Sequence, residues 1–247
     1  MRGDLKTGQQ ALIGPSAVIA AAAHELKTPL TLITYISQIL GDDSLDLSDE
    51  DRKHYLQRLQ LVSKRTLRLL QHMTMSYRLE SQSQMAFRFD LEPVNMHEVC
   101  EAALHEMTPY AQAYNQKLEL LHPGRSPVVV AHREVLFDVV VNLVDNAIRH
   151  NQPGAAVKVT SHVRGPQVRL QVHDSGGGMS TKTLRQLRSN LGALPQPFEG
   201  HAGTSGLGLY IVQQLVGAMG GTLGLGRARE GTTFFVDILR SQQLRLL

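Results

Sequence analysis

Two stretches in the first third of the chain repeat apolar residues at alternating steps of four and three, and this pattern limits the possible folds most strongly. The first stretch contains Ile19, Ala23, Leu26, Leu30, Ile33, Ser37 and Leu40, and the second contains Tyr55, Leu59, Val62, Thr66, Leu69 and Met73. Such heptad seams are typical of helices that pack lengthwise against other helices. Gly41 and the polar residues 42–48 separate the two stretches, and Ser48 followed by Asp51 is a good helix start. We therefore predict an antiparallel helical hairpin.

A single hairpin of this kind leaves much apolar surface uncovered, and pairing with a second copy would cover it. The pattern therefore predicts a homodimer whose hairpins form a four-helix bundle. We assign the hairpin to residues 15–84 and regard residues 1–14 as a linker or a truncated signalling helix.

The chain changes character after the hairpin, because short alternating strands and helices follow one another. The expected strands lie around 87–91, 117–121, 128–130, 157–163, 168–172, 222–225 and 232–239, and the expected helices lie at 94–113, 132–150 and 207–219. Gly165-Pro166 marks a turn between two strands that should pair antiparallel. Strands mixed with helices predict an α+β sandwich, which we assign to residues 85–243.

The composition excludes several classes of protein. Hydrophobic residues make up 42% of the chain, which is enough for a buried core, and Cys100 is the only cysteine, which rules out an internal disulfide and a cysteine zinc site. The net charge is only +3, without the dense basic runs or aromatic platforms of nucleic-acid binders. No apolar run approaches the roughly 20 residues of a membrane-spanning helix. We expect a cytoplasmic protein, which could be the cytosolic portion of a longer membrane-anchored sensor.

The residues from His24 to Leu30 carry the first chemical signal. His24 lies off the apolar seam and should face solvent, with Thr28 one turn later on the same face. Pro29 lacks an N–H group and should bend the helix here. Imidazole has a pKa of about 6.5, so a neutral ring nitrogen is available as a nucleophile, and the Glu25 carboxylate can accept the proton of the other nitrogen. A lone helical histidine is more often a surface residue, but these neighbours favour the nucleophile.

A second signal comes from the helix expected at 132–150. Asn142, Asn146 and Arg149 are spaced four and three apart and therefore share one face. Side-chain amides and a guanidinium suit Mg²⁺ and phosphate oxygens, because Mg²⁺ prefers oxygen ligands and retains several waters.

Two glycine-rich turns complete the set of signals. Asp174 ends an expected strand and is followed by glycines that include Gly176 and Gly178, so a carboxylate lies beside backbone that an adenine ring could approach closely. Gly206-Leu207-Gly208 leads into a helix whose N-terminal N–H groups favour phosphate. The spacing of this second turn does not match a Walker A loop, which requires Gly-Lys-Ser/Thr.

The four segments, in this order, resemble those of sensor histidine kinases, and the resemblance spans nearly the whole chain. Residues 24–30 are similar to the H-box of the family, His-Glu-Leu-(Arg/Lys)-Thr-Pro-Leu. The resemblance implies that His24 is the phospho-acceptor, that Glu25 is its assisting base, and that Thr28 orients a water molecule that hydrolyses a phosphorylated partner.

The other three segments resemble the N, G1 and G2 boxes of the kinases' ATP-binding domain, whose Bergerat-type fold is shared with gyrase, Hsp90 and MutL. The resemblance implies that Asn146 is the principal Mg²⁺ ligand, that Asn142 assists it, and that Asp174 reads the adenine of ATP. The remaining nucleotide-binding residues implied in this way are Arg149, His150, Gly176, Gly178, Gly206, Leu207 and Gly208.

The expected activity is therefore ATP-dependent phosphorylation of His24, followed by phosphotransfer to an aspartate on a response-regulator receiver domain, with phosphatase activity toward that regulator. The chain departs from the family at three places: His132 stands where Asp is common, Thr204 where Gly is common, and Pro197-Phe198-Glu199 only hints at the Phe pair of the ATP lid. These departures keep open a nucleotide-binding scaffold or a phosphatase-dominant homologue. An ATP-driven conformational machine of the gyrase kind would lack the H-box helix.

Overall fold

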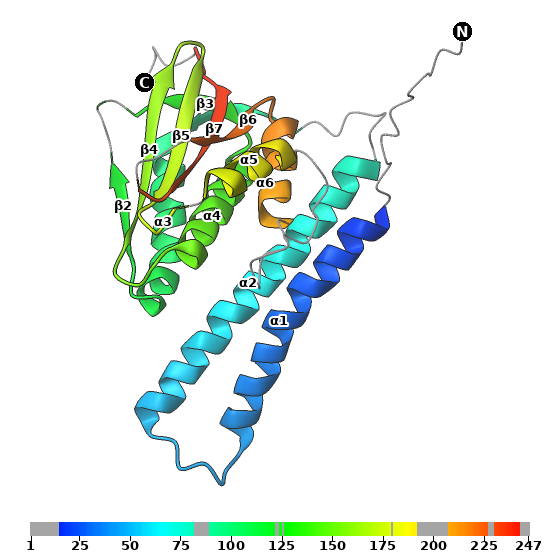
Figure 1. Ribbon diagram of the computed structural model, residues 1–247, viewed down its shortest axis with the longest axis vertical. Helices are drawn as coiled ribbons and strands as arrows, with labels where there is room; N and C mark the ends of the chain where they lie inside the picture. The colour runs from blue at the N-terminus through cyan, green and yellow to red at the C-terminus, as the bar shows by residue number, and fades with distance from the viewer. Residues whose placement is uncertain are drawn as a thin grey trace.

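The first part of the protein is a helical hairpin. The computed structural model describes the backbone of residues 15–81, 89–121, 124, 126–178, 180–191, 207–226 and 230–242. Helix α1 (Pro15–Gly41) and helix α2 (Asp49–Ser81) pack side by side and are joined by a short turn, which confirms the predicted hairpin (Figure 1). Among the helices in these ranges, none combines the length and the apolar character that crossing a membrane requires.

Ser48 caps α2 as predicted. Its hydroxyl oxygen accepts a hydrogen bond from the Asp51 backbone N–H at 3.1 Å, and the hydroxyl donates to the Asp51 carboxylate at 2.6 Å. Asp49, Glu50 and Asp51 in the first turn place negative charge at the positive end of the helix dipole. The cap therefore sets where α2 begins.

Replacing Ser48 by Ala is expected to lower the free energy of unfolding by about 1 kcal/mol, because an N-cap oxygen is lost. Urea denaturation of the two proteins measures this difference. Ser48→Thr keeps the hydroxyl and should remain close to the wild type, so an equal loss in both variants would contradict the capping role.

The packing face of the hairpin agrees with the sequence on α2 and differs on α1. All six predicted positions of α2 are at least half-buried. On α1, Pro29 and Ile36 take the places predicted for Leu30 and Ser37: Ile36 is 1% exposed, whereas Leu30 is 50% exposed. The prediction was wrong at these two positions because a step of three then four and a step of four then three have the same overall period. The seam therefore runs one residue earlier at these two steps. The prediction was also wrong at Ala23, which is exposed.

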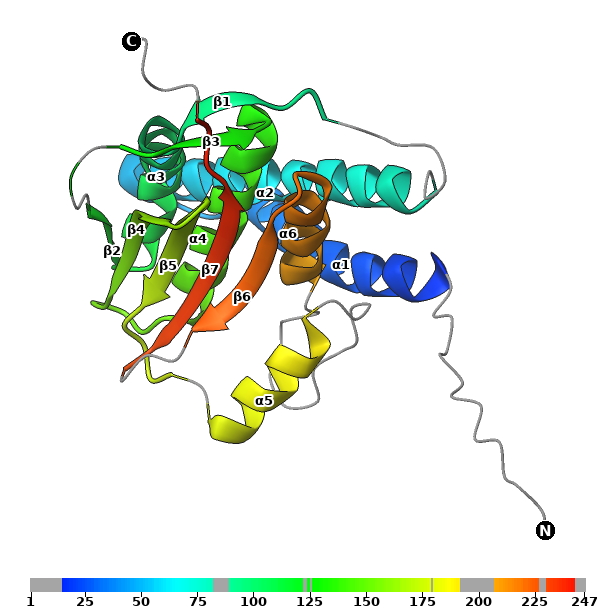
Figure 2. The ribbon, with the colours of Figure 1, turned by 90° about the horizontal axis from the view of Figure 1, so that it is seen from above.

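The second part of the protein is an α/β domain. A five-stranded mixed sheet has the order β2-β4-β5-β7-β6, and helices α3, α4 and α6 lie between it and the hairpin (Figures 1 and 2). The bounds are β1 Glu92–Asn95, α3 Met96–Ala113, β2 Lys117–Leu121, β3 Val128–Ala131, α4 Arg133–His150, β4 Ala156–Arg164, β5 Gln167–Asp174, α5 Thr181–Asn190, α6 Leu207–Ala218, β6 Thr222–Gly226 and β7 Thr232–Leu239. This layered arrangement confirms the predicted fold class.

Two local predictions need correction. Residues 89–91 of the strand expected around 87–91 are not in a strand, and residues 87 and 88 lie outside the described residues. The strand in this region is β1, which starts at Glu92 and pairs antiparallel with β3. The following helix starts at Met96 and not at residue 94, because the Asn95 side chain accepts a hydrogen bond from the His97 N–H at 3.0 Å and caps the helix there. Helix α5 was not predicted at all.

Alternation along β5 explains how a carboxylate comes to face the helices. Val168, Leu170 and Val172 are buried on the helical face of the sheet, and the strict period of two brings Asp174, the last residue of the strand, to that same face. A polar side chain thus lies at the edge of the apolar core, where the strand ends.

Candidate functional site

The Asp174 carboxylate is a buried polar group held by backbone hydrogen bonds. It is 5% exposed, and its Oδ1 accepts hydrogen bonds from the backbone N–H groups of Gly176 and Thr232, both at 3.2 Å. Burial raises the pKa of this carboxyl above its ordinary value, and the two backbone hydrogen bonds offset only part of that effect. Oδ1 accepts both of these hydrogen bonds, and neither of them involves the other carboxylate oxygen, Oδ2.

Three glycines pack closely around Asp174: a side chain on Gly176 or Gly231 would meet Asp174 itself, and one on Gly178 would meet the backbone of Gly231. A Cβ atom on Gly176 would lie 3.0 Å from Asn151 Oδ1 and 3.3 Å from Asp174 Oδ1. Gly178 has a φ of +68° and packs against the backbone of Gly231, which itself has a φ of +73°. A Cβ atom on Gly231 would lie 1.7 Å from the Asp174 carbonyl oxygen. Bare backbone is therefore required on both sides of Asp174.

Sequence analysis missed the residues that hold Asp174 from β7 and from the end of α4. Thr232 lies directly opposite Asp174 in the β5–β7 register, and Gly231 precedes it. Asn151 ends α4, and its buried Oδ1 has no hydrogen-bond partner among the described atoms. The antiparallel pairing of the two strands was a usable signal for Thr232, because the residue opposite a functional strand end is fixed by the register.

The predicted face of α4 is present. Asn142, Asn146 and Arg149 are all half-buried on one side of the helix. The Asn142 amide nitrogen donates to the Asp138 carbonyl at 2.7 Å, and Arg149 Nη2 donates to Asn146 Oδ1 at 3.4 Å. Asp145, which the sequence had not singled out, places Oδ2 3.2 Å from Arg149 Nε without hydrogen-bond geometry.

The end of α4 meets the glycine turn after Asp174. The His150 carbonyl oxygen lies 3.3 Å from the position of a Cβ on Gly176, and the side chain of His150 is exposed. The C-terminal end of α4, with His150, is therefore brought against the Asp174 turn.

The residues of α4 fit a magnesium site made largely by a ligand's own oxygens. Within the described part of the chain, no group of three or more His, Cys, Asp or Glu side chains is arranged to hold a metal ion. Among the residues that the structure describes, Asn146 Oδ1 accepts a single long hydrogen bond, from Arg149, so this oxygen could be given up to a cation. Mg²⁺ commonly takes few protein ligands together with substrate phosphates and water, and an amide oxygen suits that role.

The predicted phospho-acceptor turn lies in α1, which continues as a helix through Pro29. Glu25 is half-buried and Thr28 is exposed. The backbone of His24 belongs to α1, whereas its side chain lies outside the described atoms.

The last group of predicted residues is only partly described. Gly206, Thr204 and residues 197–199 lie outside the described residues, and so does the side chain of Leu207, the first residue of α6. Gly208 is half-buried on α6, and a Cβ atom there would meet no neighbour within 4 Å.

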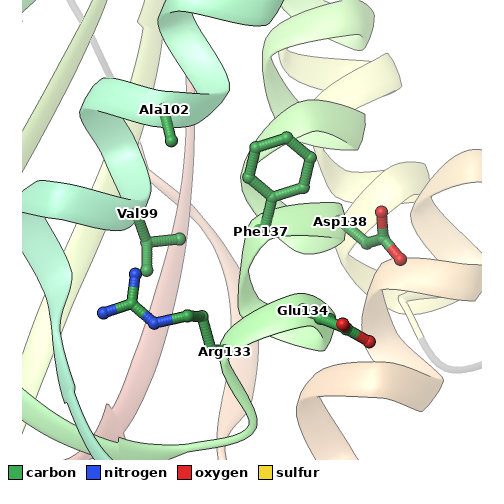
Figure 3. A pocket seen from close by; sticks show the side chains of 6 residues that line it. All are labelled: Val99, Ala102, Arg133, Glu134, Phe137 and Asp138. Carbon is green, nitrogen blue, oxygen red and sulfur yellow. The ribbon is translucent and has the colours of Figure 1, made fainter.

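A groove of about 440 Å³ lies between α3 and α4 (Figure 3). It is lined by Val99, Ala102, Arg133, Glu134, Phe137 and Asp138. Arg133 already pairs with Glu98 at 2.9 Å. None of the predicted nucleotide-binding residues lines this groove, so the geometry around Asp174, and not the size of this cavity, identifies the candidate site.

Two family descriptions match the chain, one on each part. Residues 16–82 match the His Kinase A (phospho-acceptor) domain, and residues 131–242 match the histidine kinase-, DNA gyrase B- and HSP90-like ATPase. The chain is 31% identical to the sensor protein QseC of Salmonella typhi over 214 residues, which cover 85% of this chain and 44% of that protein. It thus spans less than half of that relative's length.

Solved structures show the same fold at lower identity. The Acinetobacter baumannii histidine kinase AdeS has a TM-score of 0.58 at 23% identity, and the match covers 87% of this chain and 97% of AdeS. The histidine kinase ThkA in complex with the response regulator protein TrrA has a TM-score of 0.59 at 20% identity, and the match covers 92% of this chain and 62% of that chain.

Proposed function

The chain belongs to the sensor histidine kinase family, and from this we propose that it uses ATP to phosphorylate its own His24 and passes the phosphoryl group to an aspartate of a response-regulator receiver domain. The observation that carries the nucleotide half of the proposal is the Asp174 carboxylate, which is buried and held by two backbone N–H groups among close-packed glycines. The phospho-acceptor half rests on the H-box residues of α1, which lie within the matched phospho-acceptor domain.

Asp174 would bind the adenine of ATP. An ionised carboxylate accepts a hydrogen bond from an exocyclic amino group, and the bonds from Gly176 and Thr232 hold the carboxylate in one orientation. Gly176 and Gly178 would leave room for the flat ring, since a side chain on Gly176 would meet Asp174 and Asn151. Buried polar groups that lose their ligand partner are costly, which favours adenine over rings that lack the amino group.

The polyphosphate would lie along α4. Asn146, assisted by Asn142, would hold Mg²⁺, and Arg149 would bind phosphate oxygens. Bound Mg²⁺ supplies neutralisation of the charge that develops on the transferring phosphoryl group. Leu207 and Gly208 at the start of α6, together with Gly206 before it in the sequence, would bind phosphate through backbone N–H groups.

His24 would act as the nucleophile. Its neutral ring nitrogen would form a bond to the γ-phosphorus, the bond from that phosphorus to the β–γ bridging oxygen would break, and ADP would leave. Glu25 would accept the proton from the other ring nitrogen. In a separate reaction, the exposed Thr28 would orient a water molecule that hydrolyses a phosphorylated regulator and releases phosphate.

The proposed function includes two protein partners, a second copy of this chain and a receiver domain. Leu30, Tyr35, Leu56, Leu67 and Leu70 are large apolar side chains that remain exposed on the hairpin, which supports a homodimer through a four-helix bundle. ThkA has been solved with the response regulator protein TrrA, which supports a receiver domain as the second partner here. ATP and such a regulator would be met in the cytoplasm. The division of the chain near residue 85 belongs to the same proposal.

Incubation with γ-labelled ATP and Mg²⁺ tests this function. The expected product is an acid-labile, alkali-stable label on the protein, which is the behaviour of a phosphohistidine. Protein that binds ATP but acquires no label would contradict the kinase proposal.

Acidification is expected to weaken nucleotide binding through Asp174. Its pKa lies above the ordinary value of 3.8, so the ionised acceptor is lost at a higher pH than that of an exposed aspartate. Calorimetric titration with ATP and Mg²⁺ as the pH is lowered measures this change. Asp174→Asn should bind about tenfold to hundredfold more weakly and lack this step in the pH profile. Identical pH profiles for both proteins would rule out this role of Asp174.

A further inference from the structure

Asn151 follows the last residue of α4, and its side-chain amide lies between neighbouring turns of the domain. The Nδ2 group donates two long hydrogen bonds, to Gln116 Oε1 and to the Ala156 carbonyl, both at 3.5 Å. The reverse orientation of the amide would set its oxygen against these two acceptors, so the nitrogen occupies that side. The amide oxygen, Oδ1, therefore faces the turn after Asp174, where it lies 3.0 Å from the position of a Cβ atom on Gly176.

Gln116 anchors this amide to the end of α4. Its side chain is buried just before β2, and its Nε2 donates to the Ile148 carbonyl at 2.8 Å. The Ile148 carbonyl is one of the last four of α4, which have no partner within the helix. Gln116 thus holds both the end of α4 and the Asn151 amide that follows it.

Asn151 is also joined to the turn after Asp174. The Ala156 carbonyl that accepts from Asn151 accepts from the Ser175 backbone N–H as well, at 3.3 Å. Asn151 Oδ1 and Asp174 Oδ1 lie 3.0 and 3.3 Å from one point, the position of a Cβ atom on Gly176. Gly176 is therefore confined between the amide oxygen and the carboxylate to which its own N–H donates.

The Asn151 amide oxygen is a buried acceptor that has no hydrogen bond in the part of the chain that the structure describes. Buried polar atoms in native proteins are nearly always paired, because an unpaired one is costly. Packing alone does not account for this side chain, since an apolar residue of the same size would fill the space without that cost. The position of the oxygen, next to Gly176 and Asp174, points to a role in the site.

We propose that Asn151 is a positioning residue for adenine recognition, which holds the Gly176 backbone so that the Asp174 carboxylate keeps the orientation that receives the amino group of the base. The inference rests on the proposed nucleotide site. The Gly176 N–H is one of the two donors on the carboxylate, so a shift of Gly176 would turn the acceptor away from the base. The amide oxygen also adds partial negative charge beside the carboxylate, which disfavours a base with a carbonyl at the same place.

The test is calorimetric titration of the full chain with ADP and with inosine diphosphate, each in the presence of Mg²⁺. Inosine carries an oxygen where adenine carries the amino group, so the ratio of the two affinities measures recognition of that group. In Asn151→Ala, the preference for ADP should fall about tenfold through weaker binding of ADP, as expected for the loss of one good hydrogen bond. Binding of inosine diphosphate, which does not use the carboxylate as an acceptor, should stay within about twofold of the wild type.

Gln171→Ala is the matched control. Gln171 is a half-buried amide three residues before Asp174 on β5, and its Oε1 accepts from the Thr160 hydroxyl at 3.4 Å. The period of two places it on the opposite face of the sheet from Asp174. Its loss removes an amide of the same strand without touching the turn, so the preference for ADP should equal that of the wild type.

Asn151→Asp keeps the shape of the side chain and serves where the shorter variant does not fold. It retains an oxygen toward Gly176, loses the donated hydrogen bonds and adds a charge beside Asp174. A second carboxylate nearby raises the pKa of the first, so the loss of ADP binding on acidification should begin at a higher pH than in the wild type. The preference for ADP should again fall.

Wild-type preference for ADP in Asn151→Ala or Asn151→Asp, or an equal loss in Gln171→Ala, would overturn the role of Asn151 and leave the kinase proposal standing. Equal weakening of both nucleotides would overturn it too, because Asn151 would then support the fold and not the orientation of Asp174. Wild-type protein that binds neither nucleotide, or binds both equally, would overturn the role of Asp174 together with that of Asn151.

Discussion

Replacing His24 by Gln is expected to abolish the acid-labile label that the wild-type protein acquires from γ-labelled ATP. The amide of Gln cannot form the phosphoramidate bond, so the rate should fall by at least about 10³-fold, as it does when an enzyme loses its nucleophile. Binding of ATP should persist, because Asp174 and the glycines around it lie on strands and turns of the other domain.

His54 offers a matched control for this substitution. It is an exposed histidine on α2, whose ring makes an edge contact with Tyr55 at 6.3 Å. Label formation by His54→Gln should equal that of the wild type. If His24→Gln still acquires the label, or if His54→Gln loses it with His24 intact, the phospho-acceptor is a residue other than His24.

Replacing Gly231 by Ala should disrupt both the stability of the domain and its nucleotide binding. Gly231 combines a φ of +73° with a Cβ position only 1.7 Å from the Asp174 carbonyl oxygen, so β7 cannot keep its place beside β5. The movement would carry away the Thr232 N–H that holds the Asp174 carboxylate. We expect ATP affinity to fall at least about tenfold, which corresponds to the loss of one good charge-assisted hydrogen bond.

Gly220 is a control that separates the effect of backbone conformation from the effect of the close contact with Asp174. Its φ of +72° is nearly the same, but a Cβ atom there would meet nothing within 4 Å. Gly220→Ala should therefore lower the free energy of unfolding by about 1 kcal/mol through backbone conformation alone. Gly231→Ala should cost about 1–3 kcal/mol more, because overpacking adds to it. Urea denaturation gives both values, and equal losses would show that the close approach to Asp174 does not matter.

The hairpin shows how much of the structure the spacing of apolar residues can predict. Heptad spacing predicted both helices, and Ser48 predicted the start of the second one, because cap chemistry and apolar spacing act within a few residues. The same spacing misplaced Leu30 and Ser37, since the direction in which α1 turns its face depends on the helix it packs against. Helix α5 was not predicted for a related reason, because its few apolar side chains are buried only by the domain around them.

The sequence by itself determined the chemical groups of this protein. The H-box residues around His24, the amides and guanidinium on one face of α4, and Asp174 before its glycines are all local patterns, because helix and strand periods decide which neighbours share a face. Only the tertiary structure brought Gly231 and Thr232 to Asp174, and Arg65 to Asp145. These pairs are 57, 58 and 80 residues apart in number, and strand register and domain docking, which no local pattern encodes, decide that they meet.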